Sequence, residues 1–397
     1  MTLASTRVKV ATANEAAAEA VKDVDVDVVA IYPITPQTTV VEKIAEFVAN
    51  GDLDAELIYV ESEHSAMSAL IGASACGARA FTSTSSQGLI YMHEVLHIAS
   101  GMRLPLVMCV AMRALSAPIS IWNDHSDLMS VRDSGWVIYV ASSAQEVYDT
   151  TVMAYRLAED PEVLLPVMVA YDGFIASHTA EPFEPAGRER ALELSPKRRT
   201  WSRLDPDSPI TMGTITSPEY YYEFKYQQVV AMEKALEKAR ELERAAQRVL
   251  GRSYGLIETY KIEDADVALL VMGSYWDNAR LAVDEARRRG TRAGALRLRL
   301  YRPFPLEELE RALRGVSVLG VVDRAISYGA RPSGPIALEI AASIGRRLDL
   351  SLVSIVAGLG QRTVTVEDLT ELAVSLENAR GARDAHLVTR FYGVRGL

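Results

Sequence analysis

Short apolar runs alternate with amphipathic segments along the first 180 residues of the chain. Runs of strand length, rich in β-branched residues, are each followed by a segment with helical periodicity. We predict strands at residues 26–31, 57–60, 80–83, 104–111, 136–141 and 165–171, and helices at 14–21, 36–50, 65–78, 89–99 and 143–157. Such alternation is typical of an α/β fold whose parallel sheet is covered by helices on both faces.

The stretch Tyr32-Pro33-Ile34-Thr35-Pro36 joins the first strand to its helix. Thr35 is placed to cap this helix, with Pro36 as the first helical residue. A helix start at the carboxyl edge of a parallel sheet suits an anionic ligand, because its N–H groups lack intrahelical partners. A plain helix start explains the same residues, so the stretch alone leaves both interpretations open.

A change of pattern begins at about residue 183. Residues 183–216 carry prolines and arginines without a sustained period, which predicts an ordered connecting segment. A long helix is expected from Ser217 to Leu250. Its apolar positions predict one packed and one solvated face and are Tyr222, Val229, Met232, Leu236 and Leu250.

A second, smaller α/β unit is expected from residue 266 onward. We predict strands at 267–272, 295–301, 317–322 and 351–356, and helices at 278–289, 306–313 and 335–344. The strand at 295–301 alternates leucine with arginine, which predicts one solvated face. The expected organisation is a first domain at 1–182, a connecting segment with the long helix at 183–255, and a second domain at 256–397.

Composition narrows the class of protein. With 397 residues, two domains are the natural expectation, and a net charge of −10 argues against a nucleic-acid partner. Two cysteines, Cys76 and Cys109, cannot hold an iron–sulfur cluster within this chain. The N-terminus lacks the regions of a signal peptide and no apolar run is long enough to cross a bilayer, so we expect a cytoplasmic protein without membrane contact.

Several common active-site patterns are absent from the sequence. The glycines do not match dinucleotide-binding or P-loop spacings, and no nucleophile elbow surrounds a serine. The histidines do not combine with carboxylates at metal-ligand spacing, so we predict no metal-binding residues in this chain. His93 and His97 lie one helical turn apart and are interpreted as an ordinary histidine pair.

Three polar residues remain as candidates, each just past the end of a predicted strand. They are Thr35, Glu63 and Arg113. A parallel sheet would bring all three to one edge. Glu63 could instead be a helix-start carboxylate that stabilises the helix dipole, and Arg113 a surface arginine; the pattern alone does not decide between these interpretations.

A combination of short motifs identifies a family. Besides the stretch from Tyr32 to Pro36, the chain carries Ser62-Glu63, Thr84-Ser85-Ser86-Gln87-Gly88, Arg113-Ala114, Asp124-His125-Ser126-Asp127, Asp172-Gly173-Phe174, Tyr301-Arg302-Pro303-Phe304-Pro305 and Val322-Asp323-Arg324. With these motifs the sequence resembles the α subunits of archaeal-type pyruvate:ferredoxin oxidoreductases and of relatives that act on other 2-oxoacids. The resemblance covers nearly the whole chain.

The resemblance implies a fold, cofactors and partners. The first domain is expected to have the thiamine-diphosphate-binding fold of the pyrimidine-binding type, and the second to resemble the transketolase C-terminal domain. Thiamine diphosphate would be shared with a partner subunit, with Mg²⁺ and the 4Fe–4S clusters on partner subunits and coenzyme A as co-substrate. The expected partners are the β, γ and δ subunits of the same complex, ferredoxin, and pyruvate or another 2-oxoacid.

The resemblance also implies roles for individual residues. Glu63 would hydrogen-bond the pyrimidine ring nitrogen, and burial would help its carboxyl group to share a proton at neutral pH. Ile34 and Gln87 would complete the cofactor site. Thr35 and Arg113 would bind the substrate, since a guanidinium group matches the carboxylate of a 2-oxoacid. Single-chain relatives have small residues directly after this glutamate, where this chain has His64-Ser65. His64 therefore either lines the cofactor pocket or points away from it.

The expected activity is oxidative decarboxylation of pyruvate to acetyl-CoA and CO₂ with reduction of ferredoxin. The segment from Asp172 to Phe174 favours pyruvate over branched-chain 2-oxoacids or 2-oxoglutarate, which remain alternatives within the same chemistry. Two further alternatives are a non-catalytic assembly subunit, in which Glu63 and Thr35 are structural, and a transketolase-like enzyme without clusters. The lack of a diphosphate–metal motif in this chain disfavours the last.

Overall fold

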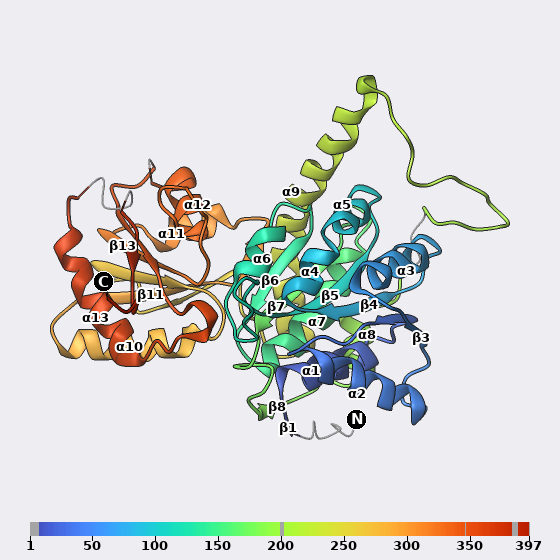
Figure 1. The fold of residues 1–397 in the computed structure, drawn as a ribbon, viewed down its shortest axis with the longest axis horizontal. Helices are drawn as coiled ribbons and strands as arrows, with labels where there is room; N and C mark the ends of the chain where they lie inside the picture. Colours follow the sequence, from blue (N-terminus) through green and yellow to red (C-terminus); the bar gives the residue numbers. More distant parts are fainter. Residues whose placement is uncertain (1–7, 199–201, 346, 383–387, 397) are drawn as a thin grey trace. The chain divides into compact units, whose positions relative to one another are not determined.

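The structure is a computed structural model that describes residues 8–198, 202–345, 347–382 and 388–396 (Figure 1). The expectation that the N-terminus carries no signal peptide rests partly on residues 1–7, which lie outside the described residues. The chain divides into two units. The first comprises Met1–Met112, Ser130–Ser253 and Tyr301–Pro303, and the second comprises Arg113–Met129, Tyr254–Leu300 and Phe304–Leu397.

The first unit is built on a seven-stranded sheet in the order β12-β6-β7-β5-β4-β2-β3. The strands are β2 (Val28–Ile31), β3 (Glu56–Tyr59), β4 (Ala80–Thr84), β5 (Leu106–Met112), β6 (Val137–Ala141), β7 (Val167–Asp172) and β12 (Leu300–Arg302). All pairs from β3 to β6 are parallel. Strands β4 to β7 are buried at every position, as expected for central strands covered on both faces.

Helices cover both faces of this sheet, with α1 and α2 on one side and α3, α4 and α5 on the other (Figure 1). Their bounds are α1 (Ala13–Asp23), α2 (Thr38–Ala49), α3 (Glu63–Ala75), α4 (Ser86–Tyr91), α5 (His93–Gly101), α7 (Ala144–Ala158), α8 (Arg188–Leu194) and α9 (Pro218–Val249). Two short antiparallel strands, β1 (Lys9–Ala11) and β8 (Glu181–Phe183), form a separate ribbon. The predicted parallel α/β fold is therefore confirmed.

The second unit contains a six-stranded sheet in the order β15-β14-β13-β10-β11-β9. The strands are β9 (Ile257–Tyr260), β10 (Val267–Val271), β11 (Ala293–Leu298), β13 (Val318–Asp323), β14 (Ser351–Val356) and β15 (Arg390–Phe391), and only β9 pairs antiparallel among the described strands of this sheet. Its helices are α10 (Tyr275–Arg288), α11 (Leu306–Ala312), α12 (Pro335–Ser343) and α13 (Val366–Ser375). A buried apolar cluster joins α10 and α13 to this sheet.

The prediction that the strand at 295–301 has a solvated face was wrong. Every position of β11 is buried, and Leu300 begins the separate strand β12. Arg297 is only 1% exposed because its guanidinium group pairs with Glu258 of β9 at 2.7 Å and lies over the Trp276 ring. A buried arginine that is paired in this way occupies an interior position, although the sequence pattern marks it as polar.

Two expected boundaries between helices and loops also differ. The single helix predicted at 89–99 is two helices, α4 and α5, that meet at Met92. The segment between β5 and β6, where no helix was predicted, contains a short helix, α6 (Ser126–Val131). The buried Asp127 carboxylate accepts hydrogen bonds from the backbone N–H groups of Arg113 and Leu128, which fixes the start of this segment.

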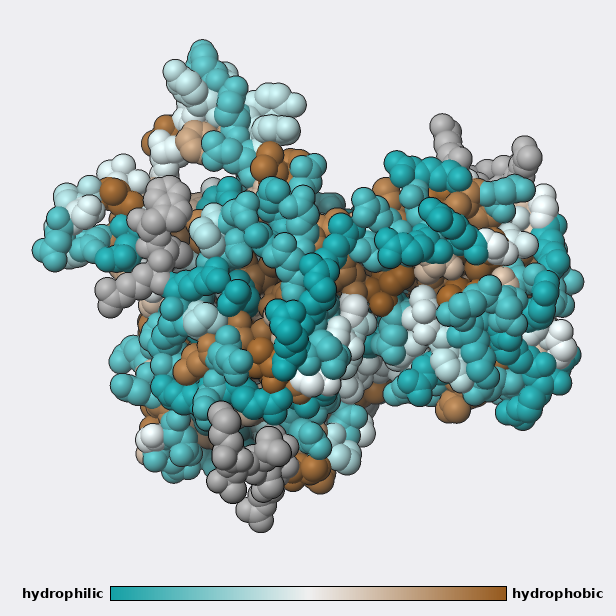
Figure 2. All heavy atoms as spheres, turned by 180° about the vertical axis from the view of Figure 1, so that it is seen from behind, coloured by the Kyte–Doolittle hydropathy of each residue, from teal (hydrophilic) through white to brown (hydrophobic). Residues whose placement is uncertain are grey.

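Helix α9 confirms the predicted long helix but only part of its predicted packed face. Leu250 is buried and Met232 and Leu236 are half-buried, whereas Tyr222 is 77% and Val229 is 51% exposed. The face that packs is made mostly of small residues, Ala231, Ala235, Ala239, Leu242, Glu243 and Ala246. Alanines four residues apart let α9 lie close to α7, α5 and α8. The N-terminal end of α9 extends beyond these helices (Figure 1), and Figure 2 shows pale and brown residues there.

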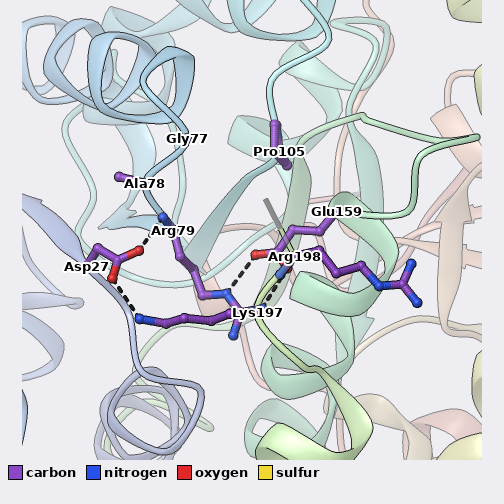
Figure 3. A pocket seen from close by; sticks show the side chains of 8 residues that line it. All are labelled: Asp27, Gly77, Ala78, Arg79, Pro105, Glu159, Lys197 and Arg198. Atoms are coloured by element: carbon purple, nitrogen blue, oxygen red, sulfur yellow. Dashed lines mark hydrogen bonds and ion pairs between the residues drawn. The ribbon is translucent and has the colours of Figure 1, made fainter. Parts of the chain in front are cut away.

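A buried ion pair ties several segments of the first unit together at the edge where β2 and β4 begin (Figure 3). Arg79 donates from Nε and Nη2 to the two carboxylate oxygens of Glu159, each at 2.6 Å, and from Nη1 to the Val24 carbonyl. The neighbouring Lys197 pairs with Asp27 at 2.7 Å. A cavity of about 380 Å³ lies beside these groups. Because their charges are already paired with one another, this cluster is structural.

We predict that Arg79→Met destabilises the protein by about 3–5 kcal/mol, because the substitution leaves the Glu159 carboxylate buried without its partner. Urea unfolding at pH 7.5 measures the effect. The control, Lys43→Met, removes an exposed pair with Glu46 and should cost less than about 0.5 kcal/mol. Adding Glu159→Leu to Arg79→Met should restore at least half of the loss; no recovery would contradict the buried pair as the cause.

Candidate functional site

The carboxyl ends of strands β3, β2 and β4 lie side by side at one edge of the first sheet. The parallel register aligns Ile31 of β2 with Tyr59 of β3, and β4 lies on the other side of β2. Thr35 follows β2, Glu63 follows β3, and Thr84 is the last residue of β4. The sheet therefore places these three positions at the same edge, where parallel α/β sheets bind ligands.

A turn rather than a helix start carries Thr35. The predicted capping role of Thr35 was wrong: α2 begins at Thr38, and Gln37 is its N-cap. The Gln37 N–H donates to the Ile34 carbonyl at 2.9 Å, which forms a turn ahead of the helix. Pro36 lies within this turn and is buried, while Thr35 is exposed and Ile34 half-buried.

Buried amide side chains hold this turn in place. Gln37 Nε2 donates to the Tyr32 carbonyl at 3.1 Å, and Gln37 Oε1 accepts from the Ser83 hydroxyl of β4 at 2.6 Å. Asn14 of α1 donates to the Pro36 carbonyl at 2.7 Å and accepts from the Tyr171 hydroxyl at 2.7 Å. Because the groups come from α1, β4 and β7, the turn is fixed against the sheet on several sides.

Glu63 is a buried acid at this edge of the sheet. It is the first residue of α3, whose N-cap Ser62 accepts a hydrogen bond from the Ser65 N–H. The residue is 6% exposed, and among the described residues no other side chain donates to its carboxyl group. Burial raises the pKa of Glu63, and a hydrogen bond from its own backbone N–H lowers it by less.

Gly88 of α4 lies directly against this acid. A methyl group on Gly88 would stand 2.5 Å from Glu63 Oε1 and 2.6 Å from Thr84 Oγ1, well inside van der Waals contact. Only glycine therefore lets α4 approach the acid this closely. The contact brings Glu63, Thr84 and Gly88 together from three separate elements.

Two buried hydroxyl groups lie where β4 ends. Thr84 Oγ1 and Ser85 Oγ are buried and make no hydrogen bond within the described part of the chain. Ser85 is the N-cap residue of α4, yet its side chain does not cap the helix. Ser86 follows with a positive φ of 50°, a conformation that a serine rarely adopts and that is often found at functional sites.

The other predicted cofactor residue, Gln87, lies in the first turn of α4. It is half-buried, and its Oε1 accepts a hydrogen bond from the Ser86 hydroxyl at 2.6 Å. His64, in α3, has its ring 5.9 Å from that of Tyr91 and its Nε2 atom 3.8 Å from Glu94.

Arg113 belongs to the second unit, as the residue directly after β5. It is only 6% exposed, and its Nε donates to the Ser120 carbonyl at 3.0 Å. Burial lowers the pKa of Arg113, and Asp127 opposes this shift. Arg113 is thus a buried arginine, and the alternative interpretation as a surface arginine was wrong.

Within the described residues, no three histidine, cysteine, aspartate or glutamate side chains gather as a metal site. His93 and His97 approach each other at 3.3 Å between ring nitrogens. No described helix has the length and apolar character needed to span a membrane.

Sequence reasoning missed several residues that shape this edge of the sheet. Thr84, Ser85 and Gly88 fall within a motif that the sequence singles out, but only Gln87 was selected from it. Asn14 and Gln37 carried no signal, because an amide that holds a distant turn has no characteristic spacing. A polar run directly after a buried strand is the signal that could have found Thr84 and Ser85.

Comparisons with known families match most of the chain. A model for the thiamine diphosphate-binding domain of pyruvate flavodoxin/ferredoxin oxidoreductase matches residues 19–244. A model for core domain II of pyruvate:ferredoxin oxidoreductase matches residues 265–369.

Curated relatives are similar over nearly their whole length. Pyruvate synthase subunit PorA of Methanocaldococcus jannaschii is 48% identical over 378 residues, which cover 94% of this chain and 95% of the relative. The PorA subunit of Thermotoga maritima is 47% identical over 80% of this chain and 82% of its own length. Ketoisovalerate oxidoreductase subunit VorA of Pyrococcus furiosus is 45% identical over 92% of each chain.

Solved structures with low sequence identity share the fold. A 2-oxoglutarate:ferredoxin oxidoreductase from Magnetococcus marinus, with 2-oxoglutarate, coenzyme A and succinyl-CoA bound, matches with a TM-score of 0.74 at 19% identity; the match covers 92% of this chain but only 64% of that one. A split-gene transketolase in an inactive β4 tetramer matches with a TM-score of 0.54 at 13% identity. Together with the family models, these matches confirm the predicted fold class.

The buried Glu63 carboxyl group generates a prediction about stability. Its folded pKa lies above the ordinary value of 4.5, so ionisation costs folding free energy as pH rises from 4.5 through the folded pKa. Glu63→Gln should therefore stabilise the protein at pH 7.5, by about 1 kcal/mol, with the gain fading below pH 4.5. Urea unfolding at both pH values measures this, with the exposed Glu42→Gln as control. Equal stability of Glu63→Gln and the unaltered chain at pH 7.5 would contradict it.

Proposed function

The chain belongs to the pyruvate flavodoxin/ferredoxin oxidoreductase family, and from this we propose that it is the α subunit of a pyruvate:ferredoxin oxidoreductase. Such a complex oxidatively decarboxylates pyruvate to acetyl-CoA and CO₂ and reduces ferredoxin. The observation that carries the proposal is the 48% identity to a pyruvate synthase subunit over 94% of the chain. The buried acid at the sheet edge supports a catalytic rather than an assembly role.

Thiamine diphosphate fits the polar groups at this edge. Glu63 offers a carboxyl group with a raised pKa, which suits sharing a proton with a ring nitrogen. Thr84 and Ser85 offer hydroxyl groups that have no partner among the described residues and can bond polar atoms of a ligand. Ile34 and Gln87 line the same cofactor site. When bound, thiamine diphosphate supplies the carbon nucleophile that attacks the 2-oxo group.

Two residues bind the substrate in this proposal. Arg113 holds the carboxylate of the 2-oxoacid, because a guanidinium group stays charged when buried and can donate two parallel hydrogen bonds. Thr35 donates its hydroxyl to the 2-oxo group, and its exposure on the turn supports contact with a ligand. Both residues orient the substrate, and Glu63 acts on the cofactor.

The remaining groups of the reaction belong to partner chains. The β, γ and δ subunits supply Mg²⁺ with the diphosphate site and the 4Fe–4S clusters, and coenzyme A and ferredoxin are the other reactants. Two cysteines in the whole chain are too few to ligate a cluster, which supports this division. In the proposed organisation, residues 1–182 form the cofactor domain, 183–255 the connecting segment and 256–397 the second domain, and the complex is cytoplasmic.

A second candidate substrate is a branched-chain 2-oxoacid. The 45% identity to a ketoisovalerate oxidoreductase subunit over 92% of the chain favours it specifically. The chemistry at Glu63 would be unchanged, because the two substrates differ only in the side chain on the 2-oxo carbon.

The function is tested by purifying the native complex and assaying a panel of 2-oxoacids with coenzyme A and a low-potential electron acceptor. We expect kcat/KM for pyruvate to exceed that for 2-oxoisovalerate by about tenfold or more. Glu63→Gln should abolish both turnover and hydrogen exchange at the thiamine C2 position, while Glu42→Gln leaves them unchanged. Normal exchange in Glu63→Gln would remove this acid from the mechanism, and a preference for 2-oxoisovalerate would establish the second candidate.

Loss of Arg113 should weaken substrate binding in the transition state. Removing a charge-assisted hydrogen bond costs about 1.5–3 kcal/mol, so Arg113→Ala should lower kcat/KM for pyruvate by about ten- to a hundredfold. Arg113→Lys should recover only part of the loss, since an ammonium group cannot donate two parallel bonds. The exposed Arg288→Ala of α10 serves as control. Unchanged kinetics in Arg113→Ala would show that the carboxylate binds elsewhere.

A further inference from the structure

A second cavity lies in the first unit, between α5, the residues that precede β6, and α9. Its volume is about 370 Å³, within the range of small-molecule sites. The lining includes residues 132–136, one residue of β12 and the middle of α9. Helices α5 and α9 contact each other beside it (Figure 1).

This cavity lies at the opposite edge of the sheet from Glu63. Residues 132–136 immediately precede β6, which begins at Val137, and the lining residues of α5 stand in the second half of that helix. Because the strands are parallel, their beginnings share one edge and their ends the other. A ligand in this cavity would therefore be separate from the proposed cofactor site.

Positive charge exceeds negative charge around the cavity. Arg132, Lys225 and Arg302 line it from three separate segments, and Asp133 is the one carboxylate among the described lining residues. Asp133 lies 3.7 Å from Arg132 and 3.4 Å from Arg302, but its side chain is 78% exposed. An exposed carboxylate between two guanidinium groups is weakly held and can be displaced by a competing anion.

The third cation, Lys225, is anchored by an amide. Its Nζ donates to Gln228 Oε1 at 3.0 Å, which is a neutral acceptor. Burial lowers the pKa of the nearby His97, and His93 and Lys225 lower it further, while Asp133 raises it. Lys225 lowers the pKa of His97 although Asp133 opposes the shift, in keeping with the three cations and one carboxylate that line the cavity.

Hydrogen-bonding groups line the inner part of the cavity. Gln228 Nε2 donates to the Ser100 hydroxyl at 3.4 Å, and Ser100 donates to the Ser134 carbonyl at 2.6 Å. Ser134 is 1% exposed, and its own hydroxyl has no partner among the described residues. A buried hydroxyl left without a partner beside a cavity points to a polar ligand group.

Apolar side chains complete the lining. Val229 and Met232 of α9 face the cavity together with the charged residues, and the fully buried Trp136 forms part of its wall. The volume is several times that of a simple ion such as phosphate, so the apolar part has room for a carbon skeleton.

We propose that this cavity binds a small organic anion. Arg132, Lys225 and Arg302 hold its phosphate or carboxylate group, and Val229 and Met232 contact its apolar body. Phosphate and carboxylate share the chemistry that these cations recognise, and the two are separated by the choice of probe.

The test measures binding to the full chain by isothermal titration calorimetry. Phenyl phosphate and benzoate are the anionic probes, inorganic phosphate tests the anionic group alone, and benzyl alcohol tests the apolar body alone. We expect saturable binding of at least one anionic aromatic probe, more tightly than inorganic phosphate or benzyl alcohol. The tighter of phenyl phosphate and benzoate identifies the anionic group. Absence of saturable binding for both would overturn the proposal.

Two variants with opposite expected effects locate the site. Lys225→Met should weaken the tighter probe by about ten- to a hundredfold, because it removes a charge-assisted bond. Asp133→Asn should tighten it by about two- to tenfold, because it removes a repelling and competing carboxylate. Binding unchanged in both variants would overturn the proposal, even if the probe binds.

Matched controls separate this site from the rest of the molecule. Lys234→Met, on the same helix but paired with Glu237 outside the cavity, should leave binding unchanged. Arg113→Ala should also leave it unchanged; loss of binding there would assign the probe to the proposed substrate residue and overturn the new site. The readout does not depend on turnover, so its failure is distinct from failure of the proposed function.

Discussion

The contact between Gly88 and the Glu63 carboxyl group is the constraint on which the functional edge of this protein depends. Helix α4 can lie against the acid only because position 88 carries no side chain. The same approach encloses Thr84, so that an acid with no side-chain donor and a hydroxyl with no partner among the described residues are buried together. Burying such groups costs folding free energy, and in the proposed function a bound ligand supplies their missing hydrogen bonds.

Polar groups at the two edges of the first sheet differ in how far they are paired with one another. Where β2 and β4 begin, Arg79 and Glu159 satisfy each other, and their pairing joins segments that are distant in the sequence. Where the same strands end, amides from Asn14 and Gln37 immobilise the turn around Thr35, while the Glu63 carboxyl group accepts no hydrogen bond from another described side chain. The paired groups stabilise the scaffold that positions this acid.

Much of the fold follows from local sequence. The alternation of apolar runs and amphipathic segments predicted the parallel sheets, because periodicity records which face of an element is buried. The pattern failed where a charged residue is buried or where large apolar residues are exposed. Arg297 is interior because Glu258 pairs with it, and α9 packs through alanines rather than through its larger residues such as Tyr222. Charge type and side-chain size are poor guides when a partner or close packing decides burial.

By itself, the sequence determined that Thr35 and Glu63 follow strands and meet at one sheet edge; the roles assigned to them rested on family resemblance. Tertiary structure alone decided what surrounds them: the glycine against Glu63, the hydroxyls of Thr84 and Ser85 that lack partners in the described part of the chain, and the turn in place of a helix cap. The physical reason is that a periodic pattern specifies which side of each element faces inward. It contains no information about which residues of distant segments come into contact there.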